Sequence, residues 1–460
     1  MLDAIFKAYD IRGIHPDQLD ADKAERIGQG AAAVLRKRAA GPIVVGRDMR
    51  TSSPNLTERL INGMRAMGAD VIDVGRVDTP FVSFAINHLE AAGGIMVTAS
   101  HNPPQYNGFK ISGAMAKPIG KATGLDDIKA LALDPPAPSS TPGEVTQRDL
   151  WAEYRGHVHQ FLDHRAVRTR PVNVVVDASN GMAGTMVPRV FGGAGAIDGL
   201  NIIELNFDNE SGVFAHEPNP LVASNLRELQ DAVKKHGADF GVCFDGDADR
   251  CVIVDDQGEI VGCDIMTAWL ARGFLAASPG AAVVYDLRSS KAVEEDVRDA
   301  GGKPVRGRVG HVFMKQALRE EAGVFGGELS GHFYFRDNFC ADSGAIAMAT
   351  VISEHAKSSS KLSERLAPIA RYAQSGEINF EVEDKDAAIA AVKQTFGGRG
   401  AIDELDGVTV DCFDAEGWWA NIRKSNTEPL LRLNLEARTR ALCDSMVADI
   451  APMLGRQVDH

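Results

Sequence analysis

The sequence predicts an α/β protein of several domains that ends in an antiparallel α+β domain. Three rounds of short β-branched runs alternating with helical stretches indicate parallel α/β units. After residue 370, closely spaced strands followed by a final helix favour an antiparallel sheet. The chain has 460 residues, more than the ~100–200 residues typical of one domain.

Each round has recognisable strands and helices. The first round predicts strands at 42–45, 71–74 and 94–97, with helices at 56–64 and 81–89. The second predicts strands at 172–176, 201–203 and 240–243, with a helix at 223–236. The third predicts strands at 282–285, 303–306 and 324–325, with a helix at 311–321. The last part predicts a helix at 384–396 and strands at 408–410, 418–422 and 431–435, and the Pro/Ser-rich segment 134–142 borders the first domain.

Composition excludes several classes of protein. A hydrophobic content of 44% and a charged content of 24% are ordinary for a globular protein. A net charge of −14 argues against binding to nucleic acid. Residues 1–12 lack the apolar core of a signal peptide, and no run approaches the ~18 apolar residues of a membrane helix. The six cysteines show no CxxC pairing, which is typical of reduced thiols in a cytoplasmic protein.

The most informative segment is Asp245-Gly-Asp-Ala-Asp-Arg250, which follows the apolar run 240–244. Asp245, Asp247 and Asp249 alternate along a loop that leaves a strand, so their carboxylates can converge on one hard cation such as Mg²⁺. An EF-hand also begins D-x-D-x-D but requires Gly where this chain has Arg250. A cation beside an arginine suits phosphate chemistry, whereas the alternative is an acidic surface turn.

Two further polar loops follow the last strand of a round, at Thr98–Pro103 and Gly327–His332. Ligands of open α/β sheets bind beyond the carboxyl ends of strands. We therefore expect the three loops to face one site, although each could be an ordinary strand-to-helix turn.

Ser100 has three interpretations. A hydrolase pair with His101 is disfavoured, because neighbours leaving a strand point to opposite sides and no G-x-S-x-G elbow is present. A phosphoserine would carry ~−1.5 to −2 charges and would need a cation to hold it, which Asp245–Asp249 could supply. Ser100 could also be a simple turn residue.

Other candidates lie on short polar segments. Lys110, near a dication and an arginine, would be driven toward its neutral form and so suit acid–base work, unless it is a solvated lysine. Tyr9 and Arg12 stand in Ala8–Gly13, where an arginine is often a surface ion-pair partner. Alternation along a strand would place Glu328 and Ser330 on one side, where they could bind adjacent sugar hydroxyls.

Two segments offer groups for an anion. Arg423–Pro429 combines a guanidinium, two hydroxyls and an amide, which suits phosphate, although it could be a capping turn after a strand. The two glycines of Gly307–His311 would let backbone N–H groups approach a ligand.

Together these motifs resemble the α-D-phosphohexomutases, in particular the phosphomannomutase/phosphoglucomutase group. The resemblance spans nearly the whole chain and keeps the motif order. Its motifs are Ala8–Gly13, Thr98–Pro103, Asp245–Arg250, Gly327–His332 and Arg423–Pro429. It implies four domains around a central cleft, three with related mixed α/β cores and a C-terminal antiparallel α+β domain. The expected bounds are 1–147, 148–257, 258–369 and 370–460.

The resemblance also implies roles for residues. Ser100 would be the phosphoserine, and Mg²⁺ would bind Asp245, Asp247, Asp249 and the Ser100 phosphate. Arg12, His101, Lys110 and Arg250 would surround the transferred phosphoryl group. Substrate would be bound by Tyr9, Arg288, Gly310, His311, Glu328, Ser330, His332, Arg423, Ser425, Asn426 and Thr427, of which the last four would hold the distal phosphate.

Three positions bear on how closely the chain follows the family. Ala248 stands where the family usually has Gly, which a turn accommodates unless that position needs a positive φ. Arg288 stands where the family often has lysine. Asn426, after Ser425, favours hexose substrates, since glucosamine mutases usually have Gly there.

The expected activity is the interconversion of hexose 1- and 6-phosphates, with mannose or glucose as the sugar, through a hexose 1,6-bisphosphate. Phosphoglucosamine mutase, a metal-dependent sugar phosphatase and a silent sugar-phosphate-binding protein are the alternatives. Phosphosugars would be the partners of a monomer or weak dimer that binds neither nucleic acid nor membranes.

Overall fold

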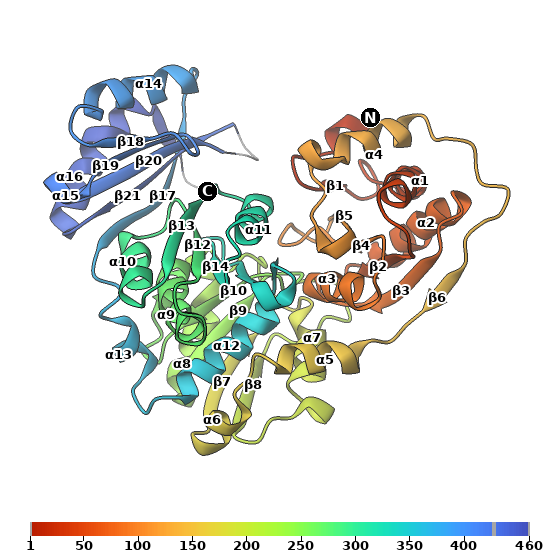
Figure 1. Ribbon diagram of the computed structural model, residues 1–460, viewed down its shortest axis with the longest axis horizontal. Helices are drawn as coiled ribbons and strands as arrows, with labels where there is room; N and C mark the ends of the chain where they lie inside the picture. The colour runs from red at the N-terminus through yellow and green to blue at the C-terminus, as the bar shows by residue number, and fades with distance from the viewer. Residues whose placement is uncertain (1, 426–428, 459–460) are drawn as a thin grey trace. The chain divides into compact units, whose positions relative to one another are not determined.

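The computed structural model describes residues 2–425 and 429–458 (Figure 1). The chain divides into two compact units, one built from residues 1–263 and 330–363 and the other from 264–329 and 364–460. None of the helices among the described residues is both long and apolar enough to cross a membrane. All six cysteines are free thiols, and only Cys340 is not buried.

The first sheet of the first unit is mixed and has six strands. Its spatial order is β1 (Ile11–Ile14), β5 (Tyr106–Gly113), β4 (Gly93–Val97), β2 (Ile43–Arg47), β3 (Val71–Arg76) and β6 (Val145–Gln147). β4, β2, β3 and β6 are parallel, whereas β5 runs antiparallel to both β4 and β1. Sequence prediction missed β5, and the first round is therefore not purely parallel.

Helices cover both faces of this sheet. One face carries α1 (Ala21–Arg38), α2 (Ser53–Ala66) and α4 (Leu125–Leu133), whose apolar residues pack with alternate strand residues such as Ile43, Val45, Ile95 and Val97. The opposite face of the sheet includes two glycines, Gly46 and Gly94, which lie against Val82 and Ile86 of α3 (Thr79–His88). α1 and α2 approach closely because Gly28 and Gly63 have no side chain. A Cβ added at either position would collide with the backbone of the other helix.

The second sheet of this unit has the spatial order β11 (Ile260–Val261), β10 (Cys251–Val254), β9 (Phe240–Phe244), β7 (Val172–Asp177) and β8 (Leu200–Leu205). β7 is parallel to β8 and β9, and β10 runs antiparallel to β9. Its helices are α5 (Trp151–His159), α6 (His164–Thr169), α7 (Ala183–Val190) and α8 (Arg227–His236).

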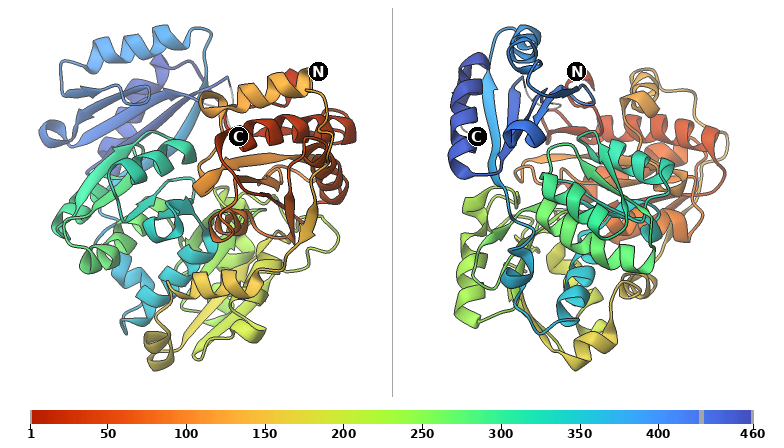
Figure 2. Two further views of the ribbon diagram at one scale, coloured as in Figure 1. Left: turned by 45° about the vertical axis from the view of Figure 1, so that its right-hand side comes forward. Right: turned by 60° about the vertical axis from the view of Figure 1, so that its left-hand side comes forward.

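The returning segment 330–363 completes the first unit. It contributes β15 (Phe333–Phe335), β16 (Ala341–Asp342) and α12 (Gly344–Ala356), which packs on α5, α6 and β7. Nearly every residue of α12 is buried. Figure 2 shows this helix in cyan beside the yellow and green elements of residues 151–260.

The second unit begins with a parallel segment. β12 (Ala282–Asp286) pairs in parallel with β13 (Lys303–Gly307) and β14 (Phe325–Gly327). The accompanying helices are α9 (Cys263–Ala277), α10 (Lys291–Asp299), α11 (His311–Glu320) and α13 (Leu362–Leu366).

The C-terminal sheet is antiparallel throughout its described strands. The spatial order is β18 (Ala401–Asp403), β19 (Val408–Cys412), β20 (Trp418–Lys424), β21 (Leu431–Ala437), β17 (Ala373–Glu381) and β22 (Arg456–Val458). α14 (Lys385–Phe396) and α16 (Arg440–Ile450) share one apolar core with alternate residues of these strands, and α15 (Phe413–Glu416) is a short turn. The predicted fold class, with mixed α/β cores and a C-terminal antiparallel α+β domain, is confirmed.

Candidate active site in the first unit

The serine loop, which we define as Thr98–Pro103, connects β4 to the antiparallel strand β5. Ser100 is 5% exposed, and its backbone is left-handed, with φ of +51°. Its backbone N–H donates to the Thr98 hydroxyl at 3.0 Å. Its own hydroxyl donates to Asp245 Oδ2 at 3.1 Å, so the serine faces the aspartate loop.

The aspartate loop, Asp245–Arg250, is the turn of a hairpin between β9 and β10. Ligand oxygens of Asp245, Asp247 and Asp249 lie within 4.8 Å of one another, and all three residues are buried. Arg250 Nε donates to Asp245 Oδ2 at 2.9 Å, and the Arg250 backbone N–H donates to Asp245 Oδ1 at 3.2 Å. The structure thus brings together the three carboxylates that alternation predicted to converge.

Two residues bind this cluster, one from strand β5 and one from helix α3. Lys110 Nζ on β5 donates to Asp247 Oδ2 at 2.7 Å and to Asp249 Oδ2 at 2.6 Å. The hydroxyl of Thr79, the first residue of α3, also donates to Asp247 Oδ2. The sequence prediction that Lys110 is driven toward its neutral form supposes a dication at the aspartate loop and stays a prediction. Burial lowers the pKa of Lys110, but the carboxylates of the aspartate loop raise it by more, so the net shift is upward.

The pKa values of Asp245 and Asp249 are shifted in opposite directions. Burial raises the pKa of Asp245 to about 7, although Arg250 opposes that shift. The pKa of Asp249 is held well below its usual range, because Lys110 and His332 outweigh the effect of its burial. Like charges at this separation disfavour one another's ionisation, and a bound cation would relieve that repulsion.

The cluster fits a hard divalent cation. Asp247 Oδ1 is buried and accepts no hydrogen bond from any residue in the described ranges. Carboxylate oxygens are the ligands that Mg²⁺ prefers. Among the described residues, Arg250 Nη2 is likewise buried without an acceptor, which leaves the two N–H groups of this nitrogen for an oxyanion.

Arg12 and His101 stand beside the serine loop. Arg12 on β1 donates to Asn102 Oδ1 and to Asp10 Oδ2. His101 is half-buried, and burial together with Arg250 and Arg12 holds its pKa well below the usual range, so the imidazole is neutral at neutral pH. Tyr9 precedes β1 and lies against Gly120.

The returning segment brings His332 and Ser330 to the aspartate loop. His332 Nε2 lies 3.5 Å from Asp249 Oδ1, and His332 Nδ1 shares a hydrogen bond of 2.8 Å with the Ser330 hydroxyl. His332 also forms a backbone bridge with Arg250. The expectation that strand alternation aligns Glu328 with Ser330 is wrong, because β14 ends at Gly327 and Ser330 lies in a turn.

Ala248 has a left-handed backbone, with φ of +57°. The expectation from the sequence is that a turn accommodates Ala248 on the condition that this position does not need a positive φ. The structure has a positive φ there, so the condition is not met. The left-handed conformation costs a residue with a side chain about 1–2 kcal/mol, whereas Gly loses about 0.4–1 kcal/mol more chain entropy on folding.

Replacing Ala248 by Gly should therefore raise the free energy of unfolding of the first unit by up to about 1.6 kcal/mol. The control is Ala130→Gly on α4, where the backbone is helical and the same change should lower it by about 1 kcal/mol. Urea titrations of both variants measure the two shifts. A loss of stability in Ala248→Gly would show that no strain is relieved.

Candidate binding residues in the second unit

Arg288 follows β12 and is held by acidic groups. Its Nη2 and Nε donate to the two oxygens of Asp286 at 2.9 and 3.1 Å, and its Nη1 donates to Glu377 Oε2 at 3.3 Å. Burial lowers the pKa of Arg288, but Asp286, Glu328 and Glu377 raise it by more. Arg288 is therefore a permanently charged group.

Glu328 and Gly310 belong to one arrangement. Glu328 Oε1 accepts the Gly310 backbone N–H at 2.9 Å and lies 3.7 Å from Arg288 Nη2. Gly310 has φ of +125°, which only glycine adopts readily, and His311 begins α11 directly after it. The structure thus brings Arg288, Glu328 and the start of α11 together.

The C-terminal sheet carries a second cationic group on its polar face. Arg423 on β20 stands directly opposite Arg432 on β21. Glu377 lies between them: its Oε2 accepts from Arg423 at 3.0 Å, and its Oε1 lies 2.9 Å from Arg432 Nη1. Glu377 thus contacts three guanidiniums, of which Arg288 is also paired with Asp286. Arg423 and Arg432 side by side suit an anion.

Burial and charge shift the ionisation of this group. Burial, followed by Arg288, lowers the pKa of Arg423. The pKa of Glu377 is lowered despite burial, because Arg288, Arg423 and Arg432 favour its charged form. Ser425 closes the following loop through its backbone N–H to Leu430 O at 2.9 Å. The predicted residues Asn426 and Thr427 lie outside the described residues.

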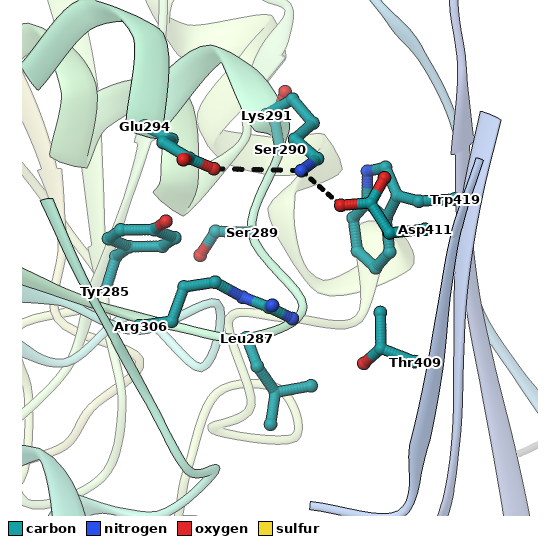
Figure 3. Close-up of a pocket in the computed structure, with 10 residues that line it drawn as sticks. All are labelled: Tyr285, Leu287, Ser289, Ser290, Lys291, Glu294, Arg306, Thr409, Asp411 and Trp419. Atoms are coloured by element: carbon teal, nitrogen blue, oxygen red, sulfur yellow. Dashed lines mark hydrogen bonds and ion pairs between the residues drawn. The ribbon is translucent and has the colours of Figure 1, made fainter. Parts of the chain in front are cut away.

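A small cavity elsewhere in this unit is too small for a sugar phosphate. It lies between β12–α10 and strands β19 and β20, and Figure 3 shows the Lys291 ammonium between Glu294 and Asp411 at its edge. Its volume of about 10 Å³ is at the lower limit for one water molecule. None of the ten residues that line it is a predicted site residue.

Sequence reasoning missed four residues of these sites: Thr79, Glu377, Arg432 and Arg50, whose guanidinium donates to the carbonyls of Ser100 and Asn102. Single residues of this kind carry no local pattern. A usable signal existed only on β20 and β21, where Asn421, Arg423, Arg432 and Asn434 occupy the positions that alternate with apolar ones. This alternation identifies a polar face that bears two arginines.

Comparison with known proteins gives a consistent result over the whole chain. Residues 3–134, 152–258 and 263–372 match the α/β/α domains I, II and III of phosphoglucomutase/phosphomannomutase, and residues 377–453 match the C-terminal domain. The phosphohexose mutases of Xanthomonas campestris pv. campestris are 42% identical, with 98% of each chain covered. A phosphomannomutase of Escherichia coli is 38% identical, again with 98% of each chain covered.

A solved structure supports the same conclusion. The X-ray structure of a phosphoglucomutase/phosphomannomutase family protein from Burkholderia thailandensis is 32% identical to this chain. The two align with a TM-score of 0.89, over 98% of this chain and 97% of the other.

Proposed function

Because the chain belongs to the phosphoglucomutase/phosphomannomutase family, we propose that it interconverts hexose 1-phosphates and hexose 6-phosphates, with mannose or glucose as the sugar. The protein is accordingly an isomerase that transfers a phosphoryl group within its substrate. The observation that carries the proposal is the Ser100 hydroxyl, which donates to Asp245 at 3.1 Å at the edge of three converging carboxylates.

Ser100 is the proposed carrier of the phosphoryl group. A free hydroxyl of the sugar phosphate attacks the phosphorus of phospho-Ser100, the bond from phosphorus to Ser100 Oγ breaks, and a hexose 1,6-bisphosphate forms. The sugar hydroxyl loses its proton, and Oγ gains one. In the reverse sense, Ser100 Oγ takes the other phosphoryl group, which leaves the isomeric monophosphate and restores the phosphoserine.

The residues around Ser100 suit this transfer. Mg²⁺, held by Asp245, Asp247, Asp249 and the Ser100 phosphate, would neutralise charge on the transferred group. Arg250 keeps the N–H groups of Nη2 for a phosphoryl oxygen, and Arg12 and Lys110 add positive charge. His101 is neutral because of burial and its cationic neighbours, so it can hydrogen-bond to the reacting groups without adding a charge.

The remaining residues are proposed to bind the sugar phosphate. Arg423, with Ser425, Asn426 and Thr427, would grip the phosphate that is not transferred. Sugar hydroxyls would contact the following residues: Tyr9, Arg288, Gly310, His311, Glu328, Ser330 and His332. The polar face of the C-terminal sheet supports this division, because Arg423 and Arg432 lie opposite each other there and share the carboxylate of Glu377.

The remaining proposals concern organisation. We propose domain bounds of 1–147, 148–257, 258–369 and 370–460, and residue 147 falls between the first two matched segments. A cytoplasmic location is proposed from the six free thiols. A monomer or weak dimer and an activating hexose 1,6-bisphosphate complete the proposal.

A coupled assay tests the activity. The 1-phosphates of mannose, glucose and glucosamine are supplied separately with a trace of glucose 1,6-bisphosphate, and each 6-phosphate is measured. Turnover of mannose or glucose without release of inorganic phosphate is the expected result. A preference for glucosamine would indicate phosphoglucosamine mutase, and phosphate released in proportion to the sugar consumed would indicate a phosphatase. Binding without turnover of any sugar would indicate a silent binding protein.

Arg423→Ala should weaken binding of both the 1-phosphate and the 6-phosphate, by roughly 1.5–3 kcal/mol each, because a charge-assisted hydrogen bond to phosphate is lost. Titration calorimetry with the two isomers measures this. Lys424→Ala is the matched control, since the exposed Lys424 pairs with Asp386 and its loss should change affinity by less than about 0.5 kcal/mol. An effect on only one isomer would contradict a shared phosphate clamp.

A further inference from the structure

Arg50 is the most completely bonded buried cation near the serine loop. It stands between β2 and α2 and is 1% exposed. Its Nε donates to Asp48 Oδ2 at 3.0 Å. Its Nη1 donates to the carbonyls of Pro103 and Tyr106 at 2.7 and 3.0 Å, and its Nη2 to those of Ser100 and Asn102 at 2.8 and 2.7 Å. All five N–H groups of the guanidinium are thus used.

The serine loop needs such a partner. The left-handed backbone of Ser100 is unfavourable for a residue with a side chain and persists only where its surroundings enforce it. Buried carbonyl oxygens also require donors. Arg50 satisfies four carbonyls within residues 100–106 and is itself oriented by Asp48, which also accepts from the Ser53 hydroxyl and the Arg50 backbone N–H. One side chain therefore defines the path of the chain through Ser100.

Arg50 is also packed against the aspartate loop. The ring of Phe214, from the segment between β8 and α8, lies over the Arg50 guanidinium with its centroid 5.1 Å from Cζ. The same ring contacts Gly246, where an added Cβ would lie 3.1 Å from two ring carbons and 2.4 Å from the Ser100 carbonyl oxygen. Ser100, Arg50, Phe214 and Gly246 therefore form one close-packed group.

We propose that Arg50 is a positioning residue for phosphoryl transfer: it holds the serine loop so that Ser100 Oγ stays directed at the aspartate loop, and Phe214 holds the guanidinium in place. The inference rests on the proposed function of Ser100. A displacement of about 1 Å of a reacting group can cost about 10²-fold in rate, so removing the clamp should reduce the transfer step far more than substrate binding.

The test compares Arg50→Lys with Arg65→Lys. Lysine keeps the charge but offers three donors from one point instead of a planar fork. Arg65 lies on α2 of the same unit and donates to the Gly143 carbonyl at 2.9 Å. Its replacement therefore also removes a hydrogen bond to a backbone carbonyl, but Gly143 is far along the chain from Ser100. Each enzyme is phosphorylated with glucose 1,6-bisphosphate, and transfer to glucose 1-phosphate is followed in a single turnover, normalised to the phosphoserine present.

For Arg50→Lys we expect this rate constant to fall by about 10²-fold while KM changes less than about threefold. Arg65→Lys should stay within about twofold of the unmodified enzyme. Because the rate is normalised to phosphoserine, a variant that merely folds poorly would yield less phosphoenzyme with an unchanged rate constant. An Arg50→Lys rate constant equal to that of Arg65→Lys would overturn the proposal.

Phe214→Leu provides a milder variant that keeps an apolar side chain. It should lower the same rate constant by a smaller factor, and in the double variant with Arg50→Lys it should add little, because both act through the guanidinium. Full additivity would count against the proposal.

Hydrogen exchange separates this inference from the proposed function. Amides of residues 99–106 should exchange faster in Arg50→Lys than in Arg65→Lys, whatever reaction the protein catalyses. If the unmodified enzyme never acquires a phosphoryl group at Ser100, the proposed function fails. If the amides exchange equally fast in Arg50→Lys and Arg65→Lys, the positioning role of Arg50 fails, whatever the reaction.

Discussion

Ser100→Ala should abolish mutase turnover, by about three orders of magnitude or more, because the Ser100 hydroxyl is the proposed nucleophile directed at the aspartate loop. The hydroxyl lies 3.1 Å from Asp245 Oδ2, and the alanine methyl has no oxygen to bond to phosphorus. Turnover is measured in the coupled assay, and the modification by intact and peptide mass spectrometry. The unmodified protein should carry a phosphoryl group at Ser100, and the variant should carry none.

Ser179→Ala is the matched control for this prediction. Ser179 is also buried, also has a left-handed backbone (φ +53°) and follows β7 of the same unit. Its hydroxyl donates to the Phe244 carbonyl at 2.9 Å, so the variant loses a buried hydrogen bond but keeps Ser100. It should lose stability yet retain phosphorylation at Ser100. An active Ser100→Ala enzyme would exclude the phosphoserine route.

Removing divalent cations should stop turnover, and adding Mg²⁺ should restore it. Asp245, Asp247 and Asp249 place their oxygens within 4.8 Å of one another, an arrangement of like charges that a cation stabilises. Asp247→Asn should weaken Mg²⁺ binding by at least about tenfold, since one charged oxygen ligand is replaced by a neutral amide. Calorimetry with Mg²⁺ alone measures this without depending on turnover.

Asp256→Asn is the control for the metal prediction. Asp256 lies in the turn after β10 and bonds to the Ser363 backbone N–H, outside the aspartate loop. Its replacement should leave Mg²⁺ affinity unchanged. Full activity in protein shown by elemental analysis to be free of metal would remove the cation from the reaction.

The sequence predicted the compact motifs better than the groups that support them. Asp245–Arg250 and Thr98–Pro103 were recognisable because several ionisable groups follow a buried strand within six residues. Arg50 acts through carbonyls that lie about fifty residues along the chain, and no local pattern reports such a distance. Glu377 was missed for a different reason: β17 is largely polar and carries a bulge between Gln374 and Glu377, so it lacks the apolar alternation that marks a strand.

Antiparallel strands account for the main difference in fold. The predicted rounds treated β4 and β9 as the last strands of parallel units, but both continue through the site loop into an antiparallel neighbour, β5 and β10. This return places Lys110 on β5 beside the aspartate loop. Periodicity identifies a strand but not its direction in the sheet, which depends on the length of the connection.

The route of the chain through the first unit constrains its synthesis on the ribosome. The buried helix α12 packs on α5, α6 and β7, yet it is translated after residues 264–329, which belong to the other unit. A nascent chain that ends at residue 329 therefore exposes the apolar surface that α12 later covers. The first unit cannot be completed before the ribosome has passed residue 356, so this enzyme should depend on chaperones more while it is being made than its number of domains would suggest.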